Sequence, residues 1–307
     1  MPRPAAIVDT HHHLWVLAGR RYPWLQEAYD PRAFILGEYR ALCQDFDAPA
    51  FRRSFGAAPV VASVHVEAEC CRTQALAETQ WLHQQHASCG LPSAVVAWVD
   101  LLAPDAGERL AEQAAWPLLR GVRFKPVTGR AAGEYPTGPG SLRDAHWPRA
   151  LQRLARHGLR WDLRVPFWHL QEAAAMLADA PAVTVVLEHT GLPWDRGDAG
   201  LAVWRKGMQA LADNPHVYVK LSELGLRGAP WHGPDNARIV AEAIAIFGWQ
   251  RCMFGSNFPV ASLRASYAQL IDMTQQALTL AGLSEAQQHA VWCGNALACY
   301  AIEGVRP

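Results

Sequence analysis

Three consecutive histidines stand near the start of the chain, in Asp9-Thr10-His11-His12-His13-Leu14-Trp15. They follow the apolar run 5–8, which is typical of a buried strand. Side chains alternate in direction along a strand, so His11 and His13 should share one face and His12 the other. Two imidazoles on the same face at the end of a strand supply half of the ligands of a divalent-metal site. A vector-derived tag is disfavoured because the histidines continue a strand; a chance cluster is the remaining alternative.

The elements that must position these histidines alternate regularly between strand-like and helix-like runs. Their spacing is about 35 residues from strand to strand, the length of one βα unit. We expect eight strands: Ala6–Thr10, Val60–Glu67, Ala94–Leu101, Gly121–Pro126, Arg160–Val165, Thr184–His189, Val217–Leu221 and Cys252–Ser256. We expect helices over Gln74–His86, Ala106–Ala115, Trp147–Arg156, Leu170–Leu177, Gly200–Ala212, Ala237–Phe247 and Ser266–Ala281.

Eight alternations without a linker predict a single domain over residues 1–307, a (β/α)8 TIM barrel with its active site at the C-terminal ends of the strands. An open doubly wound sheet is the alternative, but no glycine-rich dinucleotide fingerprint follows the first strand. The segment between the first two strands is unusually long, about fifty residues. Its Arg20-Arg21-Tyr22-Pro23-Trp24-Leu25 cluster fits a substrate lid as well as it fits a plain insertion.

Composition narrows the function classes. Lys+Arg and Asp+Glu both number 28, so nothing favours a nucleic-acid partner. No apolar run reaches the length of about 18 residues that a membrane span needs, and no leader is recognisable. Seven cysteines without a CxxC pair indicate reduced thiols. We therefore expect a cytoplasmic protein that acts on a small molecule, with its oligomeric state left open.

If the barrel is correct, polar residues should gather at the C-terminal ends of other strands, where burial of a charge is costly unless it is paired or ligated. They do so at six further strands: His65-Val66-Glu67, Arg123-Phe124-Lys125, Asp162 with Arg164, Glu188-His189, Lys220-Leu221-Ser222-Glu223 and, at the last strand, Ser256-Asn257.

Several roles are open to these residues. His189 can complete a three-histidine metal site with His11 and His13. Glu67 can be a metal ligand, a general base, a partner that orients an imidazole, or an ion-pair partner of Arg123 or Lys125. Arg123 suits a substrate carboxylate or carbonyl, or it ties neighbouring strands together. Asp162 and Arg164 share a face and are expected to pair with each other. Trp15, Trp24, Trp168 and Trp194 lie near strand ends or loops where a substrate pocket could use them.

The chain resembles the amidohydrolase superfamily, and more narrowly its branch of sugar-acid lactonases and 2-pyrone-4,6-dicarboxylate lactonase. The resemblance runs along the whole chain, through residues 9–15, Tyr22-Pro23-Trp24-Leu25, Val66-Glu67-Ala68, Gly121-Val122-Arg123, residues 186–193, Gly255-Ser256-Asn257-Phe258-Pro259-Val260, Gly294-Asn295-Ala296 and Tyr300. It implies a barrel that hydrolyses a small lactone, often with one divalent metal ion. By the resemblance, His11, His13 and His189 would hold the metal or polarise the substrate carbonyl, and Arg123 would contact a carbonyl or carboxylate.

One position departs from that pattern. The last strand of the family usually reads Gly-Ser-Asp-Trp-Pro, with the aspartate as metal ligand and general base, whereas this chain has Asn257. An amide does not accept a proton at neutral pH and is a weak metal ligand. Another carboxylate, Glu67 above all, then serves as base; or the reaction is not hydrolysis, since the superfamily includes decarboxylases; or the barrel only binds its ligand.

The sequence thus predicts a lactone hydrolase with Glu67, His189 and Asn257 in catalytic roles. Trp15, Trp24, Arg123 and Lys125 are predicted to bind substrate, and His11, His13 and His189 to hold one Zn or Mn ion, with a metal-free lactonase left open. A metal-dependent decarboxylase of a small carboxylic acid and a non-catalytic sugar-acid binding barrel are the alternatives.

Overall fold

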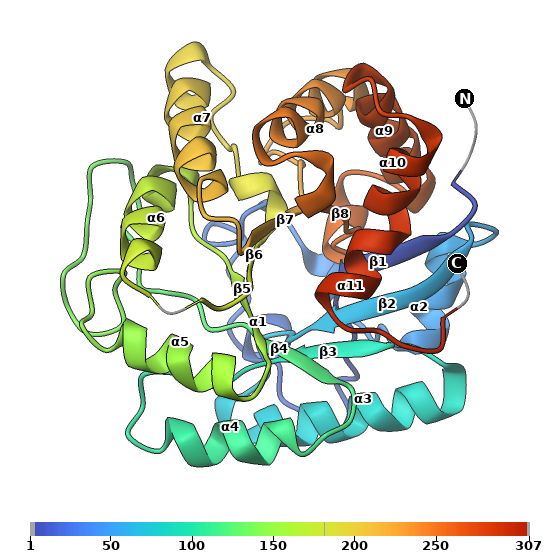
Figure 1. Cartoon of the computed structure of the whole chain (residues 1–307). Helices are drawn as coiled ribbons and strands as arrows, with labels where there is room; N and C mark the ends of the chain where they lie inside the picture. Colours follow the sequence, from blue (N-terminus) through green and yellow to red (C-terminus); the bar gives the residue numbers. More distant parts are fainter. Residues whose placement is uncertain (1–3, 181, 306–307) are drawn as a thin grey trace.

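Eight parallel strands follow one another around a barrel in chain order (Figure 1). The computed structural model describes residues 4–180 and 182–305. Its strands are β1 (Ile7–His12), β2 (Val60–Val66), β3 (Ala94–Ala97), β4 (Leu119–Val122), β5 (Arg160–Leu163), β6 (Val185–Leu187), β7 (Val217–Leu221) and β8 (Cys252–Phe254). The predicted (β/α)8 fold is confirmed, and each predicted strand overlaps an observed one. The predicted ends of several strands run too far, because the chain leaves the hydrogen-bonded ladder at the rim, where the site begins.

The helices lie around the outside of the strands (Figure 1). They are α1 (Pro23–Gln26), α2 (Ala48–Phe55), α3 (Ala75–Cys89), α4 (Ala106–Ala114), α5 (Trp147–Arg156), α6 (Leu170–Ala178), α7 (Asp198–Ala212), α8 (Gly233–Phe247), α9 (Tyr267–Leu280), α10 (Glu285–His289) and α11 (Asn295–Cys299). The seven predicted helices are present. The helices α1 and α2 lie in the long segment after β1, and α10 and α11 lie beyond the last predicted helix.

The strands are near-continuously apolar because both of their faces are covered, as in other parallel sheets. Val64, Val96 and Val186 face one hydrophobic cluster, and Val95, Val185 and Val219 face another. Between β4 and β5 the strands approach so closely that a Cβ on Gly121 would lie 3.0 Å from the carbonyl oxygen of Arg160. Glycine at this position therefore permits the pairing of β4 with β5.

The seam between β1 and β8 is closed largely by side chains and loop contacts. The buried Asp9 carboxylate accepts hydrogen bonds from the backbone N–H groups of Ser256 (2.8 Å) and His11 (3.1 Å) and from the Tyr267 hydroxyl (2.9 Å). The backbone N–H of Asn257 then donates to the carbonyl of His11 at 2.7 Å. These bonds fix the register of the histidine segment against the end of β8.

A second buried network lies inside the barrel. Lys220 on β7 and Asp162 on β5, both fully buried, form an ion pair. The Tyr300 hydroxyl donates to both carboxylate oxygens of Asp162 at 3.1 Å. The expected pairing of Asp162 with Arg164 is therefore wrong, because Lys220 reaches Asp162 across the barrel interior.

No helix in the described ranges 4–180 and 182–305 is long and apolar enough to cross a membrane.

The Lys220–Asp162 pair generates a prediction about stability. Loss of one partner leaves the other as a buried, uncompensated charge, so Lys220→Met should destabilise the fold by about 3–5 kcal/mol. The double variant Lys220→Met/Asp162→Asn should recover a large part of the loss in urea unfolding. Lys206→Met, at an exposed position of α7, is the control. A double variant no more stable than Lys220→Met would contradict the pairing.

Candidate active site

A cavity of about 340 Å³ opens at the C-terminal ends of the strands. His13, His189 and Asn257 lie on it from β1, β6 and β8, and Arg123 and Lys125 from the end of β4. The long segment after β1 contributes Trp24, Phe34 and Tyr39 to the same wall, together with further residues of the range 28–39. This long segment therefore lies over the barrel mouth and forms part of the cavity wall.

The histidine segment has the predicted alternation of faces. The Nε2 atoms of His11 and His13 lie 3.3 Å apart, whereas the His12 ring stacks on Phe51 of α2 on the opposite side. The Nδ1 atom of His13 lies 2.7 Å from the carbonyl of Val66. Because a carbonyl only accepts, Nδ1 carries the proton and the Nε2 of His13 presents a lone pair. Burial lowers the pKa of both His11 and His13 well below its ordinary value, so both imidazoles are neutral.

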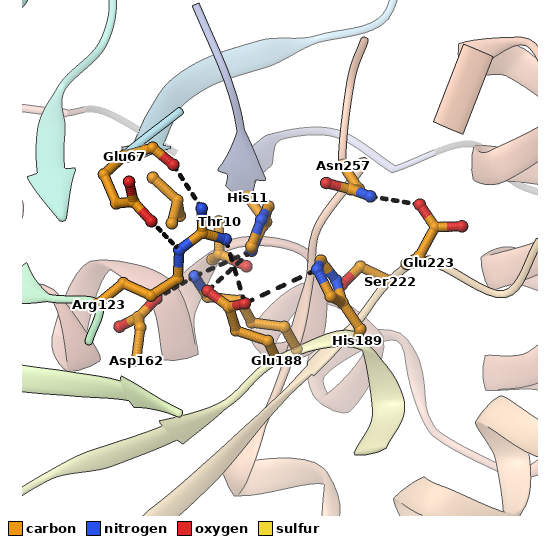
Figure 2. A network of polar contacts seen from close by, with 12 residues as sticks. Thr10, His11, Glu67, Arg123, Asp162, Glu188, His189, Ser222, Glu223 and Asn257 are labelled. Carbon is orange, nitrogen blue, oxygen red and sulfur yellow. Dashed lines mark hydrogen bonds and ion pairs between the residues drawn. The ribbon is translucent and has the colours of Figure 1, made fainter. Parts of the chain in front are cut away.

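His11, Glu188 and His189 form a compact buried group that could hold a metal ion. Oε1 of Glu188 lies 3.7 Å from Nδ1 of His11, and Oε2 lies 3.7 Å from Nε2 of His189 (Figure 2). Oε1 of Glu188 has no hydrogen-bond partner within the described part of the chain. Burial opposes ionisation of Glu188, yet Arg123 and Lys220 hold its pKa below the ordinary value, so it is a carboxylate.

This donor set fits a divalent ion. Two neutral imidazoles and one carboxylate with an orphaned oxygen are common zinc ligands. Nitrogen ligands of a tetrahedral zinc ion stand about 3.3 Å apart, a spacing that the Nε2 atoms of His11 and His13 match. That pair uses Nε2 of His11, whereas Nδ1 of His11 faces Glu188, so the two sets are alternative ligand arrangements. Glu188 was absent from the predicted ligands, although its place beside His189 at the end of β6 was a usable signal.

Arg123 is held in the centre of this group by carboxylates on both sides. Its Nε donates to Oε1 of Glu67 at 2.8 Å, and its Nη1 lies 3.4 Å from Oε2 of Glu188 (Figure 2). Oε2 of Glu67 accepts from Arg72 at 3.0 Å and from the backbone N–H of Glu69 at 2.8 Å. Both Glu67 oxygens are therefore engaged, and Glu67 is not among the residues that line the cavity. The geometry places Glu67 as the partner that positions Arg123 and corrects its assignment as base.

The predicted substrate-binding residues divide into two groups. Trp24 and Lys125 line the cavity, and Lys125 forms an ion pair with Glu69. Trp15 is fully buried and donates from Nε1 to the carbonyl of Gln44 at 2.6 Å. Its ring packs edge-on against Trp24 with the centroids 5.5 Å apart. Trp15 thus supports Trp24, and its prediction as a substrate contact is wrong because it lies in the layer behind the wall.

Asn257 lines the cavity, and a hydrogen bond to a neighbouring glutamate holds its side-chain amide. Its Nδ2 donates to Oε2 of Glu223, which follows β7 (Figure 2). Oδ1 of Asn257 and Oε1 of Glu223 have no hydrogen-bond partner in the described ranges. Burial raises the pKa of Glu223 to about 7. The sequence marks Glu223 only as a polar residue at the end of a strand. Its contact with Asn257 depends on how the ends of β7 and β8 lie relative to each other.

Four rim residues have left-handed backbone conformations that non-glycine residues seldom adopt. They are Glu69 (φ 56°), His189 (φ 59°), Glu223 (φ 47°) and Asn257 (φ 56°). Such conformations cost free energy and persist where surrounding contacts impose them. These residues follow the ends of β2, β6, β7 and β8. The left-handed backbone at each of these strand ends therefore sets the direction of a polar side chain at the rim.

A barrel with histidine, carboxylate and arginine groups converging on one rim cavity is the architecture of a TIM-barrel hydrolase. The family model described as Amidohydrolase matches residues 8–302. The chain is 31% identical to the L-fucono-1,5-lactonase of Burkholderia multivorans over 96% of each chain. It is 34% identical to the uncharacterized protein y4mH of Sinorhizobium fredii over 97% of this chain and 99% of that one.

A solved amidohydrolase from Burkholderia multivorans with bound zinc superposes with a TM-score of 0.78 and 31% identity, over 97% of this chain and 100% of that one. The chain belongs to the amidohydrolase family. The predicted family and the prediction that the protein is one of its hydrolases are confirmed.

The raised pKa of Glu223 generates a prediction about pH. The native state holds its proton up to pH of about 7, whereas the unfolded chain releases it near pH 4.5. The contribution of Glu223 to stability is therefore greatest below pH 4.5 and falls as pH rises to 7. Relative to Glu223→Gln, the wild type should lose about 3 kcal/mol of unfolding free energy between pH 4 and pH 8.

Chemical unfolding at each pH measures this difference. Glu112→Gln, at an exposed position of α4, is the matched control. Parallel stability curves for the wild type and Glu223→Gln would show that the carboxyl ionises normally in the fold.

Proposed function

We propose that this protein hydrolyses a small lactone, a sugar-acid lactone or a related carboxylated cyclic ester, with the aid of a divalent metal ion. The observation that carries the proposal is the meeting of neutral imidazoles, the Arg123 guanidinium and the Asn257 amide on one cavity of about 340 Å³. That cavity has room for a single substituted ring. The relative named L-fucono-1,5-lactonase, matched along nearly the whole chain, supports the same chemistry.

In this reaction water adds to the lactone carbonyl and the ring C–O bond breaks. The released alkoxide takes a proton, so that lactone plus water gives the hydroxy acid. Negative charge develops on the carbonyl oxygen during the addition. Arg123 retains N–H groups beyond those that bind Glu67 and Glu188, and these can stabilise that oxygen. Glu67 contributes by fixing the guanidinium, which avoids reorganisation when the charge appears.

The proton of the attacking water needs an acceptor other than Asn257. When no metal ion is bound, we assign this role to His189, which lines the cavity and whose Nδ1 lies 3.0 Å from Oγ of Ser222. With an ion in the site, His189 would be one of its ligands, and the lowered pKa of the water would replace the need for this base. Burial lowers the pKa of His189 well below its ordinary value, so the imidazole is neutral and able to accept a proton. Asn257, steadied by Glu223, presents Oδ1 as an acceptor for the water or for a substrate hydroxyl.

A zinc or manganese ion held by His11, Glu188 and His189, with His13 beside them, would supply a Lewis acid and lower the pKa of a bound water to about 7. The single domain, the cytoplasmic location and the absence of nucleic-acid or membrane partners remain predictions of the sequence.

The reaction is tested with a panel of aldonolactones, and acid release is followed at constant pH. The proposal expects a rate of acid release at least about 100-fold above the uncatalysed rate for one or more lactones, and no CO2 release from aromatic or aliphatic acids. Lactonase activity seen only in Asn257→Asp would show that the natural chain is not a lactonase. CO2 release without acid release would favour the decarboxylase.

The metal assignment is tested by binding. Chelated and dialysed protein should bind about one equivalent of zinc or manganese in calorimetry, and His11→Asn and Glu188→Gln should each weaken binding about 10-fold or more. His216→Asn, at an exposed position after α7, is the control and should bind as the wild type does. Less than about a tenth of an equivalent bound by the wild type would reject the metal-assisted version and leave a metal-free lactonase.

A further inference from the structure

A second, larger cavity opens beside the first. It measures about 1120 Å³ and shares Asp30, Ala33, Ile35, Lys125 and Arg164 with the inner one. The two cavities are therefore adjacent, and Arg164 lies at the boundary between them. We call the second one the outer cavity.

Arg164 follows β5 and is half-buried. No hydrogen bond or ion pair engages its guanidinium among the residues that the structure describes. Burial lowers the pKa of Arg164, and the carboxylates of Glu69, Glu188 and Glu223 oppose that shift without bonding to it. Three cations near Arg164 in the barrel mouth and interior have carboxylate partners: Arg123 with Glu67, Lys125 with Glu69 and Lys220 with Asp162. Arg227, which also lines the outer cavity, donates to the backbone carbonyls of Arg32 and Phe34.

The nearby carboxylates do not serve Arg164 because each is committed elsewhere. Glu69 pairs with Lys125, Glu188 with Arg123, and Glu223 accepts from the Asn257 amide. A partly buried guanidinium without an acceptor is costly, and its planar fork matches a carboxylate or a phosphate. A bound anion would therefore supply the acceptor that Arg164 lacks.

Resting on the proposed lactonase activity, we propose that Arg164 binds an anionic substituent of the substrate, a carboxylate or a phosphate, at the boundary between the two cavities. The lactone carbonyl then lies in the inner cavity near Arg123, and the anionic group points toward the outer one. Trp168 and Trp194, whose ring centroids are 5.7 Å apart, form an apolar wall of the outer cavity beside that group.

Arg164 is therefore a specificity-determining residue. It would raise the affinity for anionic lactones without taking part in the bond changes, so its effect should appear mainly in KM.

The test compares wild type with Arg164→Gln on three probes: D-glucono-1,5-lactone, which is neutral, 6-phosphoglucono-1,5-lactone, and 2-pyrone-4,6-dicarboxylate. The wild type should prefer one of the anionic probes, which also separates phosphate from carboxylate. Arg164→Gln should lower kcat/KM for the preferred anionic probe about 10- to 100-fold, mainly through KM, and leave the neutral lactone within about twofold. Arg149→Gln, with the same charge change at an exposed position of α5, should behave as the wild type.

Calorimetric binding of the two anionic probes supplies a readout independent of turnover. Anion binding that is lost in Arg164→Gln, without hydrolysis of any lactone by the wild type, would uphold the role of Arg164 and reject the lactonase proposal. Equal kcat/KM and equal binding in wild type and Arg164→Gln, or no binding of either anion by the wild type, would overturn the role of Arg164.

Discussion

The site depends first on how β1 meets β8. Asp9 binds the backbone of Ser256 and His11 together with the Tyr267 hydroxyl, and so ties the first and last strands of the barrel. Burial raises the pKa of Asp9 to about 6, which is the electrostatic cost of placing a carboxyl at this seam. The seam sets the position of the imidazoles of His11 and His13 relative to Asn257, since a slip of one residue would turn both to the other face of the strand.

The second determinant is the distribution of buried charge. Arg123 and Lys220 are surrounded by Glu67, Glu188 and Asp162, all of which are almost wholly excluded from water. Each cation has a carboxylate partner, yet one oxygen of Glu188 stays without one in the described residues. The negative charge of Glu188 is only partly compensated by these cations, and two neutral imidazoles lie beside it, so the group favours binding of a cation. At the barrel mouth, Arg164 carries a positive charge without an ion-pair partner among the described residues, which favours binding of an anion. This distribution of charge supports the proposals of a metal ion among the buried groups and of an anionic substituent near Arg164.

The sequence was sufficient for the barrel, for the shared face of His11 and His13 and for the rim location, because these follow from local periodicity and strand order. It was insufficient where a role depends on contacts between distant strands. Glu67 was interpreted as a base because its ion pair with Arg123 was one of several equal possibilities. The prediction of Trp15 as a substrate contact fails because residue spacing does not show whether a side chain in a long loop faces the cavity or packs behind its wall. Glu188, Glu223 and Arg164 required the positions of neighbouring strand ends.

The replacement of the usual aspartate by Asn257 is best understood together with Glu223. Two ionised carboxylates in contact here would repel each other, and one would retain its proton. An amide removes that repulsion and gives Glu223 a donor, while Asn257 still lines the cavity. The amide cannot remove a proton from water, so proton transfer must pass to an imidazole. The left-handed backbone at Asn257, Glu223 and His189 aims all three groups from neighbouring strands. An amide at this one position therefore leaves the other polar groups of the rim in place, and under the proposed function it moves proton transfer to an imidazole.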